Sequence, residues 1–202
     1  MLYLIRHAEA LGNAQGRIMG QQDLPLTERG RTQAKALAAY LAASGIRLTS
    51  VFTSDLQRAA DTARAVAARC DGNLRVRADL REIGMGDLEG LTYLEAGARR
   101  GRSEPIRGGE PAEAIRTRVA RSGAELVGAA RTADVAAVTH GGTLAHLLRL
   151  LLELPALPSP GAPSIRHDNT GVSVLSFGPE GTRLLCLNTL YHLVGAVPGR
   201  AP

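Results

Sequence analysis

Arg6 and His7 come directly after Leu2 to Ile5, an apolar run of strand character. A strand end is where α/β folds present reactive side chains. Arginine recognises phosphate with a fixed fork of donors, and histidine acts as a nucleophile or general base near neutral pH. The pair therefore indicates a phosphate site with its own attacking group. Arg-His pairs also occur by chance, so the rest of the chain has to support this interpretation.

Two further strand ends carry residues of the same kind. The segment Val51–Thr53 leads to Arg58 in the first turn of a helix, and the segment Asp134–Thr139 ends at His140. In a parallel sheet the three strand ends lie on the same edge, and the helix that starts near Ser54 adds free backbone N–H groups. We therefore predict that two guanidiniums and two imidazoles converge on one anion.

The loop from Leu80 to Gly90 supplies an acid, which a purely cationic pocket would lack for the leaving group. It contains three carboxylates, those of Glu82, Asp87 and Glu89. Its glycines allow tight turns and a close approach of the backbone. Residue type alone does not choose among the three.

The elements that must position these residues can be predicted from periodicity and capping signals. Strands are predicted at 2–7, 51–53, 73–78, 134–139, 172–177 and 184–187. Helices are predicted at 27–44, 54–69 and 112–131, with an apolar helix after 142 whose leucines lie between 144 and 152. Thr27 is predicted to cap the first helix, and Ser54 with Gln57 to form a capping box for the second. Strands alternate with helices, which indicates an α/β fold with a mainly parallel sheet.

Composition limits the classes of partner. The chain has 202 residues, which favours one domain over 1–202, with 195–202 as a loose tail. Its net charge is +5, but the arginines are spread among carboxylates and aromatics make up only 3%, which argues against nucleic acid. No apolar run is long enough to span a membrane. Cys70 and Cys186 show neither metal-ligand spacing nor a disulfide framework, so we expect a cytoplasmic protein. The apolar C-terminal half would permit a homodimer.

The motifs occur together in a known order. Arg6-His7-Ala8-Glu9 resembles the Arg-His-Gly-Glu signature of the histidine phosphatase superfamily, the phosphoglycerate mutase-like proteins. The segment 54–63 is similar to that family's second arginine motif, 80–90 to its acid loop, and 139–142 to its second histidine motif. The resemblance covers essentially the whole chain. It implies a three-layer sandwich in which helices flank the mainly parallel central sheet.

The resemblance also implies roles for single residues. His7 attacks phosphorus and becomes a phosphohistidine, while Glu82, favoured by its spacing to the family motif, protonates the leaving oxygen and then activates water. Glu89 is assigned to ordering the loop. The implied phosphate ligands, besides His7 and Glu82, are Arg6, Asn13, Arg58, His140 and Gly141. No metal or other cofactor is needed, because fixed cations supply the electrostatic stabilisation. His146 is predicted to be structural, and His167 and His192 to be supporting or surface residues.

Two positions depart from the family pattern. Ala8 replaces a glycine and Ala10 replaces a residue that usually carries a hydroxyl group; we expect activity to survive both. The resemblance implies that mutases of this family have an extended segment after the acid loop. Here only about twenty residues separate Gly90 from Gly108, which favours a more open pocket that water can enter. We therefore expect a phosphomonoester hydrolase that acts on a small phosphorylated metabolite.

The alternatives are a phosphoglycerate mutase or phosphotransferase and, third, an inactive phospho-ligand-binding protein, which would be expected to lose His7 or Glu82. Specificity is expected to come from residues 11–22, 83–87 and 93–111. A second anionic group of the substrate could be read by arginines in or near these segments, although solvated arginines are the default. They are Arg17, Arg99, Arg100, Arg102 and Arg107.

Overall fold

The computed structural model describes residues 1–99, 105–155 and 164–194. In these ranges the strands form one sheet in the order β3-β2-β4-β1-β5-β6. The strands are β1 (Leu2–Arg6), β2 (Ser50–Thr53), β3 (Asn73–Val76), β4 (Val135–Thr139), β5 (Val172–Gly178) and β6 (Gly181–Thr189). β3, β2, β4 and β1 are parallel neighbours, whereas β5 and β6 form a hairpin that pairs antiparallel with β1. The predicted α/β class with a mainly parallel sheet is confirmed.

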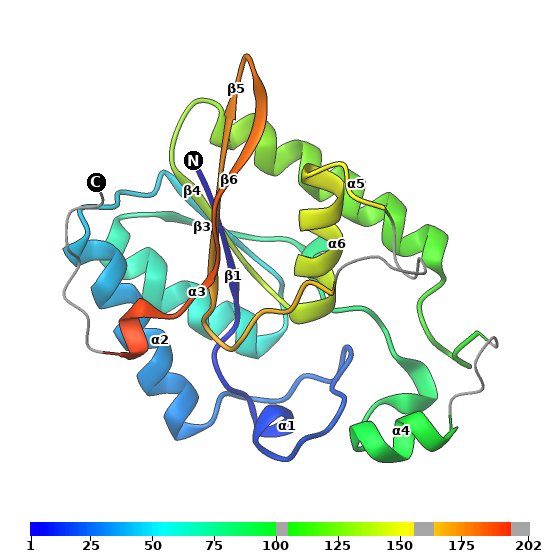
Figure 1. The fold of residues 1–202 in the computed structure, drawn as a ribbon. Helices are drawn as coiled ribbons and strands as arrows, with labels where there is room; N and C mark the ends of the chain where they lie inside the picture. Colours follow the sequence, from blue (N-terminus) through cyan, green and yellow to red (C-terminus); the bar gives the residue numbers. More distant parts are fainter. Residues whose placement is uncertain (100–104, 156–163, 195–202) are drawn as a thin grey trace.

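Helices cover both faces of this sheet. The α-helices are α1 (Leu11–Ala14), α2 (Glu28–Ala43), α3 (Gln57–Cys70), α4 (Tyr93–Arg99), α5 (Ala112–Ala130) and α6 (Gly141–Leu151). Short 3-10 turns are η1 (Ala78–Leu80), η2 (Gly86–Leu88) and η3 (Tyr191–Leu193). Figure 1 shows α2 and α3 on one face and α5 and α6 on the other, with the smaller α1 and α4 beyond one end of the sheet. The three-layer sandwich is confirmed.

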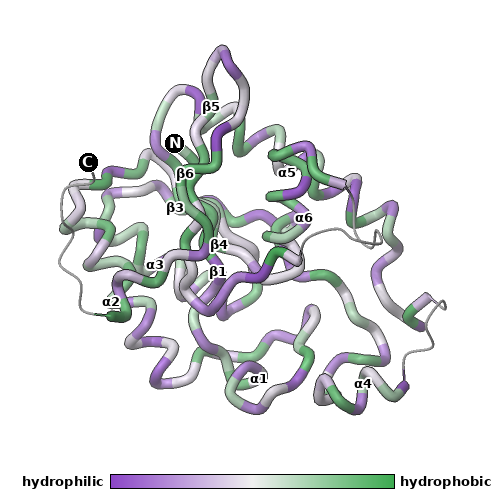
Figure 2. The backbone as a smooth tube through the Cα atoms, in the orientation of Figure 1, coloured by the Kyte–Doolittle hydropathy of each residue, from purple (hydrophilic) through white to green (hydrophobic). Residues whose placement is uncertain are grey.

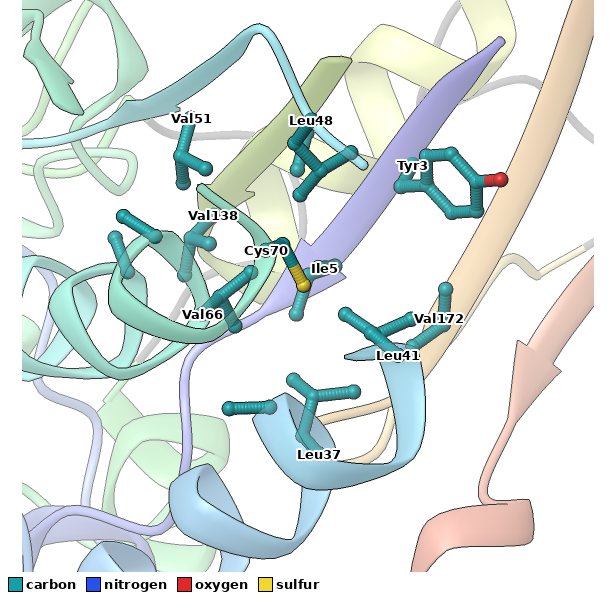
Figure 3. Close-up of a cluster of buried hydrophobic side chains, with 14 of the residues drawn as sticks. Tyr3, Ile5, Leu37, Leu41, Leu48, Val51, Val66, Cys70, Val138 and Val172 are labelled. Atoms are coloured by element: carbon teal, nitrogen blue, oxygen red, sulfur yellow. The ribbon is translucent and has the colours of Figure 1, made fainter. Parts of the chain in front are cut away.

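The core is split between the two faces of the sheet, because successive side chains of a strand point to opposite sides. Tyr3 and Ile5 of β1 pack toward α2 and α3, where Leu37 and Val66 are fully buried (Figure 3). Leu2 and Leu4 belong to the second cluster, against α5 and α6. Both faces of β1 are therefore covered, and hydrophobic residues concentrate along the central strands in Figure 2. This explains why the strand has a continuous apolar sequence rather than an alternating one.

The register of the sheet determines where the residues at the strand ends lie. Arg6 pairs with Thr139, and Thr53 pairs with Val138, so β1, β2 and β4 end almost level. The residues that follow these three ends, His7, Ser54 and His140, are thereby brought to one edge. The predicted convergence of strand ends is confirmed at the level of the backbone.

The helix starts agree only in part with the capping predictions. The hydroxyl of Thr27 accepts a hydrogen bond from the backbone N–H of Gly30 (2.9 Å), as predicted. The predicted Ser54–Gln57 capping box is wrong, because α3 has no side-chain cap from its own segment. Instead the carboxylate of Asp23 accepts the backbone N–H of Gln57 (2.6 Å). β6 is also longer than the predicted strand at 184–187, and the predicted tail at 195–202 lies outside the described residues.

Candidate active site

His7 is held as a neutral imidazole at the end of β1. Its side chain is only 2% exposed, and Nδ1 lies 2.7 Å from the carbonyl oxygen of Ala8. A carbonyl oxygen can only accept, so Nδ1 carries the proton and Nε2 keeps its lone pair. Burial lowers the pKa of His7 well below its usual range, and the charges of Arg6 and Arg58 lower it further. The imidazole is therefore uncharged near neutral pH.

The motif around His7 is fixed from behind by backbone contacts. The N–H of Ala8 donates to the hydroxyl of Thr62 (3.0 Å), and the N–H of Glu9 donates to Gln33 (2.9 Å). The Glu9 carboxylate accepts the hydroxyl of Thr27 (2.7 Å) at the start of α2. Neighbouring helices thus position the signature segment.

Two arginines share the cavity with His7. The fully buried Arg58 donates from Nη1 to the carbonyl of Gln22 (2.6 Å) and from Nη2 to that of Gly20 (2.7 Å). Arg6 donates from Nη1 to the carbonyl of His167 (2.6 Å). The Nε atoms of both arginines are buried and make no hydrogen bond within the described residues. Each guanidinium therefore keeps donors for an anion.

His140 packs against His7 but is not among the residues that line the cavity. Its ring centroid is 5.0 Å from that of His7, and its Nε2 bonds to the hydroxyl of Ser54 (2.7 Å). This bond explains why Ser54 does not cap α3. Burial first, and then His7 and Arg58, lower the pKa of His140 well below its usual range. Its Nδ1 is buried with no hydrogen bond inside the described ranges.

Glu82 sits at the N-terminus of α6. Its carboxylate accepts backbone N–H groups from Ile83 (2.9 Å), Gly142 (3.1 Å) and Thr143 (3.1 Å). A helix start favours negative charge, so this end of α6 holds the carboxylate in place. A Cβ atom on Gly142 would lie 2.7 Å from the carboxylate, which explains the glycine.

The other carboxylates of the acid loop have different surroundings. Glu89 accepts the backbone N–H groups of Gln21 and Met85 (both 2.9 Å), so it orders the loop, as predicted. Asp87 is exposed. Glu82 is the member of the three that lines the cavity.

A cavity of about 400 Å³ joins these groups. Of the predicted site residues, it is lined by Arg6, His7, Asn13, Arg58 and Glu82. His140 and Gly141 do not line it, whereas the next residue, Gly142, does. His146, His167 and His192 are not among the lining residues either.

Asn169 was not predicted as a site residue. Its side-chain amide donates to the carbonyl of His7 (3.0 Å) and to Oδ1 of Asn13 (3.2 Å). Because Oδ1 of Asn13 also accepts the N–H of Ala10 (3.0 Å), the NH₂ group of Asn13 remains available as a donor. Asn169 is distant in sequence from both partners, so no local pattern of residues indicates these contacts.

Arg118 and Glu110 were also missed. Arg118 of α5 binds Glu110 with two hydrogen bonds (2.5 and 2.9 Å) and donates to the carbonyl of Arg81 (2.9 Å). Glu110 in turn accepts the N–H of Gly84 (3.2 Å). This pair supports the acid loop on both sides of Glu82, and a helix arginine in a sequence carries no signal for such a role.

The arginines predicted to read a second anionic group of the substrate differ in their positions relative to the cavity. Arg17 lines the cavity, and its Nη1 donates to the carbonyl of Gly90 (2.7 Å). Arg99 donates weakly to the carbonyl of Asp87 (3.4 Å), Arg107 lies 3.9 Å from the Asp87 carboxylate, and neither lines the cavity. Arg100 and Arg102 lie outside the described residues.

Among the described residues, no group of three or more His, Cys, Asp or Glu side chains is arranged to hold a metal ion. Within those ranges, too, no helix has both the length and the apolar character needed to cross a membrane.

Comparison with known proteins gives the family. The model of the histidine phosphatase superfamily (branch 1) matches residues 2–190. The chain belongs to this superfamily. Its members transfer phosphoryl groups through a histidine.

Sequence relatives and solved structures carry both mutase and phosphatase names. "Probable phosphoglycerate mutase GpmB" from Enterobacter sp. (strain 638) is 36% identical over 168 residues, 77% of this chain and 76% of that protein. The structure of a mycobacterial glucosyl-3-phosphoglycerate phosphatase with VO3 is 31% identical, covers 94% of this chain and 99% of its own, and has a TM-score of 0.79. The alpha-ribazole phosphatase from Shigella flexneri is 28% identical over 93% of this chain and 96% of its own, with a TM-score of 0.78.

Proposed function

We propose that this histidine phosphatase is a metal-independent phosphomonoester hydrolase that acts on a small phosphorylated metabolite through a phosphohistidine on His7. The observation that carries the proposal is the state of His7. Its Nδ1–H is bound to the Ala8 carbonyl, its pKa is lowered, and it lines a cavity with Arg6 and Arg58. A neutral imidazole with a free Nε2 lone pair is the form that attacks phosphorus.

The cations around His7 suit the charge of a phosphoryl group. Three equatorial oxygens carry that charge in the transition state, and fixed donors stabilise it without reorganisation. Arg6, Arg58 and the NH₂ group of Asn13 supply donors in the cavity. The ring of His140, with Gly141 next in the chain, lies 5.0 Å from that of His7, and we assign it to holding the imidazole pair and the developing charge in place.

Glu82 is the proposed proton carrier. In the first step, the Nε2–P bond forms, the ester P–O bond breaks, and Glu82 gives its proton to the leaving oxygen. In the second, Glu82 takes a proton from water, the water oxygen attacks phosphorus, and the N–P bond breaks to release phosphate.

The names of the structural neighbours support hydrolysis. The two phosphatases named above match nearly the full length of this chain, and one neighbour is described in complex with inorganic phosphate. The sequence relatives support a second candidate, a phosphoglycerate mutase. The two candidates differ in the acceptor of the phosphoryl group, which is water in one and a phosphoglycerate in the other.

Hydrolysis of p-nitrophenyl phosphate in the presence of EDTA tests the first candidate. We expect turnover by the wild type, none by His7→Ala, and a reduction of about 10²- to 10⁴-fold in Glu82→Gln. Asp87→Asn is the matched control, because this exposed carboxylate belongs to the same loop and does not line the cavity. Turnover that persists in His7→Ala would exclude His7 as the nucleophile.

Incubation with 3-phosphoglycerate, followed by ³¹P NMR, separates the two candidates. A hydrolase produces inorganic phosphate, whereas a mutase produces 2-phosphoglycerate. Appearance of 2-phosphoglycerate without release of phosphate would refute the hydrolase.

A further inference from the structure

The cavity has a charged end and an apolar end. The charged end holds Arg6, His7 and Arg58, and the walls beyond it are formed by side chains such as Ile18, Ile83, Met85 and Tyr93. Tyr93 is 68% exposed, and the other three are half-buried, so apolar surface lies open to the cavity. A substrate whose phosphate reaches His7 must place its organic part against these walls.

Three separate segments build the apolar end. Ile18 follows α1, Ile83 and Met85 belong to the acid loop, and Tyr93 begins α4; these segments meet where α1 and α4 lie at one end of the sheet (Figure 1). The N–H of Ile18 donates to the carbonyl of Leu91 (2.8 Å), and the N–H of Gly90 donates to the carbonyl of Ile18 (2.7 Å). These backbone bonds tie the wall segments together, so the apolar surface is preformed.

Among the described residues, few charged side chains lie at this end. Arg17 is the one charged side chain among the described residues that line the cavity apart from Arg6, His7, Arg58 and the proposed acid Glu82. It is exposed, and one of its guanidinium nitrogens already binds the carbonyl of Gly90 (2.7 Å). Arg17 keeps free donors, but an exposed guanidinium is screened by water, so it contributes little to the binding of a second anionic group. Apolar walls, by contrast, gain free energy when they cover a hydrocarbon group.

We propose that the substrate is a phosphomonoester of an apolar alcohol, with its hydrocarbon part against Ile18, Ile83, Met85 and Tyr93. This proposal rests on the proposed function for the placement of the phosphate at His7. It differs from the chemistry of phosphoglycerates, which carry a carboxylate close to the phosphate and little hydrocarbon.

Binding of alkylphosphonates, measured by calorimetry, tests the apolar end without requiring catalysis. Ethylphosphonate and hexylphosphonate have the same charged head. One fully buried methylene contributes about fourfold, so four more methylenes in a half-open cavity should strengthen binding about tenfold. The 6-phosphonohexanoate has the same chain length but ends in a carboxylate, and we expect it to bind more weakly than hexylphosphonate.

Two variants test whether the apolar walls cause the preference for the longer alkylphosphonate. Tyr93→Ala should reduce the preference for hexylphosphonate over ethylphosphonate about threefold. Leu94→Ala is the matched control, because Leu94 is 85% exposed on the same helix and does not line the cavity; it should leave the preference unchanged. The proposal is overturned if the two alkylphosphonates bind equally, or if 6-phosphonohexanoate binds more tightly than hexylphosphonate and loses that advantage in Arg17→Ala.

Hydrolysis of ethyl phosphate, hexyl phosphate and 3-phosphoglycerate is measured alongside. All three are esters of primary alcohols, so differences in kcat/KM report the organic part rather than the leaving group. We expect hexyl phosphate to have the highest kcat/KM. If no ester is hydrolysed but hexylphosphonate still binds more tightly than ethylphosphonate, the proposed function is refuted, whereas binding of hydrocarbon at the apolar end is supported.

Discussion

Gly30 lies in the first turn of α2, directly against the segment that carries His7. A methyl group on Gly30 would lie 2.9 Å from the carbonyl carbon of Glu9 and 3.1 Å from its nitrogen, and closer still to its carbonyl oxygen. These are backbone atoms, which cannot rotate away as a side chain can. Gly30→Ala must therefore push the signature segment and α2 apart, by about 1 Å if van der Waals contact is to be restored.

Two effects of this substitution oppose each other. Alanine is the better helix former, by at most about 1 kcal/mol. Forcing an extra methyl into a close-packed site costs about 1–3 kcal/mol. The steric cost is larger, so we expect Gly30→Ala to lower the free energy of unfolding by about 1–2 kcal/mol. Displacing His7 by about 1 Å should lower kcat by about 10²-fold.

Urea unfolding and p-nitrophenyl phosphate turnover measure the two effects. Gly128→Ala is the matched control, because Gly128 lies in α5 and an added methyl there meets no atom within 4 Å. This control should gain up to about 1 kcal/mol of stability and keep full activity. If Gly30→Ala were as stable and as active as Gly128→Ala, the contact between α2 and Glu9 would not position His7.

Burial, and after it the charge of Arg6, lowers the pKa of His167 to about 4. Between pH 4 and 6.5 this histidine is therefore protonated in the unfolded chain but not in the folded one. The free energy of unfolding should therefore fall as the pH is lowered through this range, by up to about 1.4 kcal/mol per pH unit. Urea unfolding at pH 7.5, 5.5 and 4.5 measures this fall, which should be smaller in His167→Gln than in the wild type. Asp23→Ala removes the acceptor for the N–H of Gln57, so it should lower the free energy of unfolding by about 1 kcal/mol in urea titrations, whereas equal midpoints would show that water replaces this cap. Asn169→Ala frees the amide of Asn13 and should lower kcat for p-nitrophenyl phosphate about tenfold with an unchanged circular dichroism spectrum; an unchanged kcat would refute a positioning role.

The order of elements and most of the site could be predicted from the sequence. Apolar runs marked the buried strands, Thr27 marked the start of α2, and the strand ends located His7 and His140. These features are local, since a strand covered on both faces and a capped helix each leave a signature in adjacent residues. The single domain, the cytoplasmic location and the homodimer stay predictions.

Partners that are distant in sequence could not be predicted. Ser54 and Gln57 have capping-box spacing, but the Ser54 hydroxyl is bound to His140 and the cap comes from Asp23, 34 residues before Gln57. A capping box predicts only that a serine is able to accept a helix N–H; it cannot show that a buried imidazole competes for the same hydroxyl. The role of Asn169 could not be predicted for the same reason, because its partners His7 and Asn13 lie 162 and 156 residues away in the sequence.

The two departures from the family signature are explained by the direction in which their side chains point. Ala8 is fully buried and packs in a small cluster with Leu26 and Ala34. It does not adopt a positive φ, so the position does not require glycine. Its backbone still provides the carbonyl that binds Nδ1 of His7 and the N–H that binds Thr62. Ala10 is likewise buried and does not line the cavity. A methyl at either position therefore leaves the cavity side of His7 unchanged, because the signature acts on His7 through its backbone.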